Sequence, residues 1–131
     1  MIQGIGVDLT EIKEIKRLAE ETGGVFTART FTQREQEGAA QAADRWEYLA
    51  GRYAAKEAVF KALAHLTPEK TFDFRKIETC SSEDGSPYVV LPPILRKAMK
   101  EAGVGKIHIS LTHEKEYACA FAVAESDICV K

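Results

Sequence analysis

The chain has 131 residues, of which 45% are hydrophobic, and its 18 basic and 20 acidic residues give a formal net charge of −2. This length suits one compact core and no Pro/Gly/Ser-rich linker interrupts it, so we expect a single domain over residues 1–131. Acidic and basic residues are mixed along the chain, so no strong positive field is expected to attract a polyanion, which argues against nucleic acid as a partner.

Membrane insertion and disulfide bonding are also not expected. No apolar run approaches the roughly 18 residues that span a bilayer, and the N-terminus lacks the pattern of a secretion signal, so we expect a cytoplasmic protein. The odd number and wide spacing of Cys80, Cys119 and Cys129 fit neither a zinc site nor a disulfide framework. We expect Cys80 and Cys119 to be reduced packing residues and Cys129 to be an exposed thiol.

The first element is predicted to be a strand followed by a helix. Residues 2–9 alternate as in a strand, and Gly4 and Gly6 allow other groups to approach one of its faces closely. Asp8 lies near the end of this strand, and Thr10 is predicted to cap a helix that ends at the glycines at 23 and 24. Residues 25–43 have a broken pattern, for which we expect short helical pieces.

A long helix is predicted to follow. Asp44-Arg-Trp-Glu47 has the form of a capping box and indicates a helix from there to about Leu63. Its apolar stripe skips Lys56 and leaves Glu57 at the edge. We expect a ligand to approach this helix closely beside its small residues, Ala50, Ala54 and Ala58.

The rest of the chain alternates hairpins with one helix. Residues 77–80 and 87–91 bracket an Asp-Gly pair and predict two antiparallel strands. Pro92 and Pro93 open a helix with Ile94 on its apolar face, and strands are predicted at 106–113 and 117–124. The last strand has an all-alanine face, which implies a closely packed neighbour. The order of elements predicts an α+β fold.

Three residues indicate phosphoryl-type chemistry. Glu57 and Lys61 are one helical turn apart and share a face. Together with Asp8, Glu57 supplies the two carboxylates that magnesium typically takes from a protein. A cation at the phosphates would stabilise the leaving group, while Lys61 holds a phosphate oxygen.

Ordinary structural roles remain open for the same residues. Glu57 and Lys61 could form a surface helix pair worth about 0.3–0.5 kcal/mol, with Asp8 capping a turn. A lone histidine such as His113, at a strand end, is commonly a hydrogen-bonded structural residue. Arg45 and Arg52, about two turns apart on the long helix, suit either solvent or a phosphate.

Several separated segments together resemble the holo-acyl carrier protein synthase family of phosphopantetheinyl transferases over nearly the whole chain. They comprise residues 4–9 around Asp8, residues 29–32 with Glu35, residues 49–63 around Glu57, and residues 109–113. The resemblance implies the 4′-phosphopantetheinyl transferase fold, in which an antiparallel sheet packs against a long helix and shorter helices.

The resemblance also implies an activity. Members transfer 4′-phosphopantetheine from coenzyme A to a serine of apo-acyl carrier protein, release adenosine 3′,5′-bisphosphate and require Mg²⁺. Asp8 and Glu57 match the metal ligands, and Lys61 matches a lysine that contacts phosphate. The carrier serine attacks, and either Glu57 or a water held by the metal removes its proton. Residues that match the coenzyme A site are Arg45, Arg52, Lys61, Gly85, Pro87, Ser110 and His113.

Short members of this family form homotrimers with sites between subunits, so the resemblance implies a homotrimer, and the alanine face at 118–124 is a candidate assembly surface. Two rival functions remain open at this point. One is a magnesium-dependent phosphohydrolase acting on coenzyme A or a nucleotide. The other is a non-catalytic module that binds coenzyme A or the carrier, because Ala64-His65-Leu66 replaces the glycine-containing turn that is common in the family.

Overall fold

The computed structural model describes residues 1–68 and 73–127, so the predicted thiol at Cys129 lies outside the described residues. The described residues form five strands and five helices, with short 3₁₀ turns at Ala64–Leu66 and Phe74–Lys76. In chain order they are β1 (Ile2–Glu11), α1 (Ile12–Glu21), α2 (Val25–Thr30), α3 (Gln33–Gln41), α4 (Arg45–Leu63), β2 (Glu78–Ser81), β3 (Pro87–Val90), α5 (Pro93–Glu101), β4 (Val104–His113) and β5 (Tyr117–Ser126).

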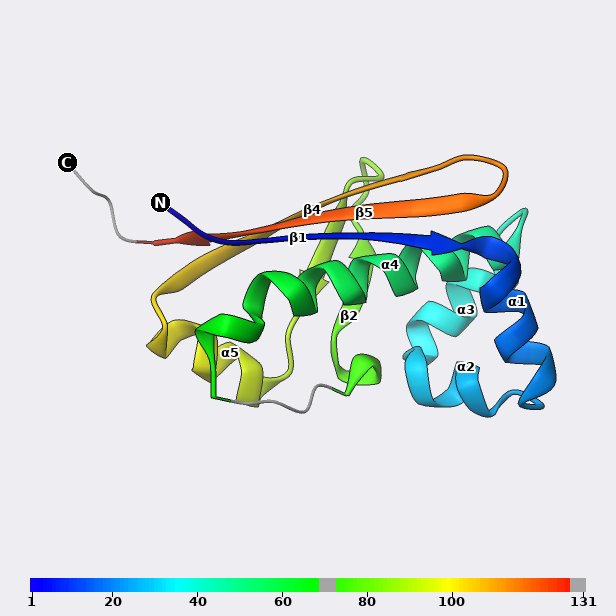
Figure 1. Ribbon diagram of the computed structural model, residues 1–131, viewed down its shortest axis with the longest axis horizontal. Coiled ribbons are helices and arrows are strands. Elements are labelled where there is room, and N and C mark those ends of the chain that lie inside the picture. Colours follow the sequence, from blue (N-terminus) through cyan, green and yellow to red (C-terminus); the bar gives the residue numbers. More distant parts are fainter. Residues whose placement is uncertain (69–72, 128–131) are drawn as a thin grey trace.

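The architecture is one antiparallel sheet lying on one long helix. The three long strands pair in the order β1-β5-β4, while β2 and β3 form a separate two-stranded sheet. Helix α4 runs along the sheet, with α1–α3 grouped at one end of the molecule and α5 at the other (Figure 1). The predicted α+β class is confirmed. None of the described helices is both long and apolar enough to cross a bilayer.

Small residues bring the sheet unusually close to α4. A Cβ atom on Gly6 would lie 1.8 Å from the carbonyl oxygen of Ala58, and one on Gly4 would lie 1.9 Å from that of Ala62. The alanines on the facing side of β5 are buried in the same contact. The predicted close approach at Gly4 and Gly6 is therefore confirmed, and α4 is the group that approaches.

Two predictions about alanines are wrong for the same reason. Ala50, Ala54 and Ala58 of α4 are fully buried against neighbouring elements, so no ligand reaches the helix there. The alanine face at 118–124 packs on α4 of its own chain and is not an assembly surface.

The opposite face of the sheet is apolar and exposed. Ile5, Val7, Leu9 and Phe121 expose 54%, 53%, 64% and 44% of their surface. Val7 lies opposite Phe121 in the β1-β5 ladder, so these side chains form one patch. We call Ile5, Val7, Leu9 and Phe121 the outer patch. A sheet normally packs its apolar face inward, and here the glycine and alanine face packs.

Two local predictions from the sequence are wrong, and two are confirmed. Thr10 does not cap α1, because its hydroxyl donates to Asp8 and the N-cap residue is Glu11. Ile94, expected on the apolar face of α5, is exposed. The hairpin of β2 and β3 is confirmed, and Cys80 and Cys119 are free thiols as predicted.

Candidate functional site

Asp8 is held on the inner face of β1, between the sheet and α4. Its side chain is only 15% exposed, and its Oδ1 atom lies 3.3 Å from Nζ of Lys61. The same ammonium donates to the carbonyl oxygen of Val7 at 3.1 Å. The hydroxyl of Thr10 donates to the other oxygen of Asp8 at 2.6 Å. Each carboxylate oxygen of Asp8 therefore has a partner, and the Lys61 contact joins α4 to β1.

Glu57 shares this neighbourhood. Burial, and then the negative charge of Asp8, raise the pKa of Glu57, while a hydrogen bond from Tyr53 and the charge of Lys61 act in the opposite direction. Burial and the charge of Glu57 raise the pKa of Tyr53 to about 12, so the phenol stays protonated. The repulsion between the carboxylates locates Asp8 and Glu57 within electrostatic reach of each other.

The donor set at Asp8 and Glu57 fits magnesium. Two carboxylates repel in a partly buried place where Lys61 supplies one positive charge, so a divalent cation would relieve the remaining negative charge. Magnesium typically takes one or two carboxylates and leaves its other positions to water and substrate. Within residues 1–68 and 73–127 no cluster of three or more His, Cys, Asp or Glu side chains exists. Asp8 and Glu57 therefore suit magnesium better than a metal whose ligands come mostly from the protein.

A second group of polar residues lies on the β4 side of α4. His113, at the end of β4, has its Nδ1 atom 3.3 Å from Oε2 of Glu47. Arg52 is buried, stacks over the ring of Tyr48 and donates from Nη2 to Oγ of Ser81 at 3.0 Å. Nη1 of Arg52 is buried without a hydrogen-bond partner in the structure.

A cavity of about 220 Å³ is lined by residues of this second group. His113, Thr112 and Leu111 come from β4, and Arg52 and Gly51 are among those that come from α4. Its lining also includes the carboxylates of Asp44 and Glu47, so both positive and negative side chains face this cavity.

The remaining residues predicted for a coenzyme A site are spread over the surface. Pro87 lies opposite Ser81 in the β2-β3 ladder, beside the contact of Arg52. Gly85 is in the turn of that hairpin with φ +86°, which favours glycine. Ser110 lies opposite Phe121, next to the outer patch. Arg45 stacks on Trp46 and lines a different cavity, beside Ala19 and Ala39.

Within one chain, the predicted residues thus fall into groups on different sides of α4. Asp8, Glu57 and Lys61 are brought together on the β1 side. Arg52 and His113 are brought together on the β4 side, and Ala120 of β5 pairs with Asp8 on one side and Leu111 on the other. A whole strand therefore separates the carboxylates from the strand that carries His113.

Some neighbours of the site were not among the candidates from sequence. Tyr53 precedes Glu57 by one helical turn, and this spacing was available as a signal, but an aromatic residue in an apolar stripe is ordinarily assigned to the core. Glu47 and Ser81 carried no such signal, because their partners His113 and Arg52 are distant in sequence.

Residues 4–122 match the family model described as the 4′-phosphopantetheinyl transferase superfamily. The chain is 38% identical over 125 residues to a protein from Halothermothrix orenii named holo-[acyl-carrier-protein] synthase, covering 95% of this chain and 98% of that one. It is 40% identical over 127 residues to the protein of the same name from Clostridium kluyveri, covering 97% and 92%.

Solved structures of proteins with that name are also similar. The one from Neisseria meningitidis superposes with a TM-score of 0.86 at 35% identity, covering 96% of this chain and 100% of the other. The one from Bacillus anthracis, described as a complex with CoA (3′,5′-ADP), has a TM-score of 0.77 at 31% identity, covering 97% and 99%.

Proposed function

The chain belongs to the 4′-phosphopantetheinyl transferase superfamily, and from this we propose that it is a holo-acyl carrier protein synthase. It transfers 4′-phosphopantetheine from coenzyme A to a serine of apo-acyl carrier protein and releases adenosine 3′,5′-bisphosphate. The observation that carries this proposal is the similarity to proteins of that name over nearly the full length of both chains.

We propose that Asp8 and Glu57 hold a magnesium ion. The mutual repulsion of the two carboxylates supports this assignment, as does the presence of a single lysine beside them. The metal would supply positive charge at the phosphate groups when it is bound.

Lys61 and Glu57 are proposed to act on the reacting groups. Half of the Lys61 side chain is exposed, so its ammonium can bind a phosphate oxygen without leaving the neighbourhood of Asp8. The serine oxygen of the carrier bonds to phosphorus while the bond to adenosine 3′,5′-bisphosphate breaks. Glu57 is the proposed acceptor of the serine proton, because it lies one helical turn from Lys61, the residue assigned to the phosphate oxygen.

We assign coenzyme A binding to Arg52 and His113, with Arg45, Gly85, Pro87 and Ser110 as neighbours and Lys61 at the phosphate. The guanidinium group of Arg52 and the imidazole of His113 on the lining of one cavity support this assignment, because both groups can bind a phosphate.

A homotrimer with sites between subunits follows as part of the same proposal. The two groups of site residues lie on different sides of α4, so one copy can present its carboxylates to the arginine and histidine of another. The outer patch offers the apolar surface that such an assembly would bury.

The proposed location is the cytoplasm, which suits the free thiols of Cys80 and Cys119.

The test is to incubate the protein with coenzyme A, magnesium and a purified apo-acyl carrier protein, and to weigh the intact carrier by mass spectrometry. We expect the carrier to gain one phosphopantetheine, and a chelator to abolish the gain. Release of nucleotide without any carrier would instead identify a phosphohydrolase. Tight binding of coenzyme A without turnover across several carriers would identify a binding module.

A further inference from the structure

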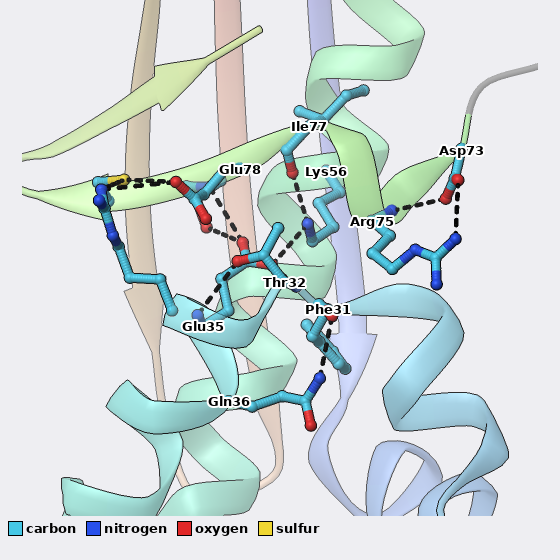
Figure 2. A network of polar contacts seen from close by, with 12 residues as sticks. Phe31, Thr32, Glu35, Gln36, Lys56, Asp73, Arg75, Ile77 and Glu78 are labelled. Atoms are coloured by element: carbon cyan, nitrogen blue, oxygen red, sulfur yellow. Dashed lines mark hydrogen bonds and ion pairs between the residues drawn. The ribbon is translucent and has the colours of Figure 1, made fainter. Parts of the chain in front are cut away.

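A fully buried ion pair joins α3 to α4 and has no part in the reaction described above. Nζ of Lys56 is 2.7 Å from Oε1 of Glu35, and both side chains are 0% exposed (Figure 2). Removing two charges from water is costly, so a buried pair persists only when further hydrogen bonds satisfy both groups.

Further hydrogen bonds join this pair to three elements. Oε1 of Glu35 accepts from the backbone nitrogen of Thr32 at 2.8 Å, which caps α3. Its Oε2 accepts from the backbone nitrogen of Thr79 at 3.0 Å and from the hydroxyl of Thr79 at 2.9 Å. Nζ of Lys56 also donates to the carbonyl oxygen of Ile77 (Figure 2). Helices α3 and α4 are thereby tied to β2 and to the residue that precedes it.

These contacts fall at every second residue, at Ile77 just before β2 and at Thr79 and Ser81 within it. Lys56 is hydrogen-bonded to Ile77, and Glu35 to Thr79. Arg52, one turn before Lys56 on α4, is hydrogen-bonded to Ser81. Because strand residues alternate between two faces, a slip by one residue would remove these contacts together. An isolated two-stranded hairpin is only marginally stable, so contacts from outside must fix its position.

The register of this hairpin decides what surrounds Arg52. Ser81 accepts from Nη2 of Arg52, and Pro87 lies opposite Ser81 in the ladder. The carboxylates on the other side of α4 depend on different contacts, because Gly6 of β1 packs on the backbone of Ala58. A change in the buried pair should therefore disturb the Arg52 side of the helix and spare the Asp8 side.

We propose that Lys56 and Glu35 are positioning residues for coenzyme A. They set the register of the β2-β3 hairpin on α4 and thereby hold Ser81 and Pro87 around the guanidinium of Arg52. The inference rests on the proposed function, in which Arg52 contacts coenzyme A. It assigns to the pair an effect on coenzyme A affinity that is separate from the chemical step.

The main test compares Thr79→Val with Thr30→Val, a threonine of similar burial on α2 that makes none of these contacts. The dissociation constant of coenzyme A is measured by calorimetry on the intact protein, and kcat and KM by transfer to the carrier. We expect Thr79→Val to weaken coenzyme A binding by up to about tenfold, because the hairpin is then held less firmly around Arg52, with kcat within about twofold. Thr30→Val should leave coenzyme A affinity unchanged.

A double variant separates positioning from stability. Lys56→Met alone leaves the Glu35 carboxylate buried without its cation and is expected to fold poorly. Lys56→Met combined with Glu35→Gln removes both charges, so it should melt close to the wild type and still bind coenzyme A at least about tenfold more weakly, since nothing then donates to the Ile77 carbonyl.

Wild-type affinity in the folded double variant, or a fall in kcat with unchanged affinity in Thr79→Val, would overturn the proposal. If the wild-type protein binds coenzyme A but transfers nothing to a carrier, the proposed reaction fails, while the comparison of dissociation constants still tests the positioning role. If the wild type binds no coenzyme A, both proposals fall.

Discussion

Glu57 is proposed both to bind the metal and to accept a proton, and its surroundings in the fold shift its pKa. Burial and the neighbouring Asp8 raise its pKa, and Tyr53 and Lys61 partly oppose that rise. A carboxylate in such a place is costly as long as no cation accompanies it. This balance favours a site that is completed by a bound metal over an ordinary surface pair.

Replacing Glu57 with glutamine should remove most of the activity and leave the fold intact. Glutamine keeps the size of the side chain but loses the charge that binds the cation and the basicity that accepts a proton, so we expect kcat to fall on the order of 10²–10⁴-fold. Steady-state transfer assays and circular dichroism measure the two effects. Glu101→Gln, on an exposed position of α5, is the matched control, and undiminished turnover in Glu57→Gln would exclude the assigned role.

Asp84 gives a prediction for pH. Hydrogen bonds from Ser82 and Ser86 lower the pKa of this turn carboxylate from 3.8 to about 2. Because the pKa in the folded state is the lower one, its stabilisation of the turn is present above the ordinary value and is lost as the pH falls through about 2. A carbon-detected NMR titration should find this lowered pKa, and an ordinary pKa for Asp84 would contradict the turn geometry.

On the scale of elements, the contact between β1 and α4 fixes the carboxylates. Gly4 and Gly6 leave no side chain between the strand and the helix backbone, so Asp8, on the same face, is carried up to the residues of α4. The same packing buries Ala58 and Ala62 completely. Any enlargement at this contact must move the strand or the helix, because the atoms opposite are backbone.

Two glycine-to-alanine substitutions should have opposite effects. In Gly6→Ala the new methyl group meets the backbone oxygen of Ala58, so we expect a loss of about 1–3 kcal/mol or more in the free energy of unfolding. Gly51 lies inside α4 with open space around its Cβ position, so Gly51→Ala should stabilise the protein by up to about 1 kcal/mol. Urea unfolding of both variants decides the matter, and equal stabilities would refute the packing argument.

On the scale of the whole molecule, a single chain leaves the outer patch exposed to water. Its four large apolar side chains lie together on the sheet, while scattered exposed apolar residues such as Ile94 are ordinary on protein surfaces. Covering this patch with other copies would remove apolar area from water. It would also allow site residues from different sides of α4 to meet.

Phe121→Glu should therefore disrupt the proposed homotrimer. A charge in the outer patch cannot be buried without a partner, so light scattering should report a smaller mass. Activity should fall with it if, as proposed, each site combines residues of two copies. Ile94→Glu, which puts the same charge on an exposed residue of α5, should change neither mass nor activity. A monomeric Phe121→Glu variant with full activity would show that a single copy contains the whole site.

Much of the fold was accessible from local pattern. The alternation at 106–113, the Asp-Gly pair at the hairpin and the capping residue Asp44 each predict an element that the structure contains, because periodicity and capping are short-range properties. Asp8, Glu57 and Lys61 were also singled out, since Glu57 and Lys61 are separated by one helical turn and Asp8 lies near a strand end. The structure brings them together, and their roles stay predictions.

Which face of each element is buried was decided by the tertiary structure. The sequence shows that β1 has a glycine side and an apolar side, and a general rule assigns the apolar side to the core. In this fold β1 lies so close to α4 that Gly4 and Gly6 face the helix backbone, so Ile5, Val7 and Leu9 face outward. The same applies to Lys56, which is polar by residue type but is buried because Glu35 and Ile77 satisfy its ammonium.

By itself, the sequence determined the elements, the α+β class and the chemical types gathered at Asp8, Glu57 and Lys61, because these depend on neighbours within a few residues. Only the tertiary structure decided that Lys61 pairs with Asp8, that Arg52 lies beside Ser81, and that the carboxylates and His113 occupy different sides of α4. Such contacts join residues far apart in the chain, and they exist only once the packing distance between helix and sheet is fixed.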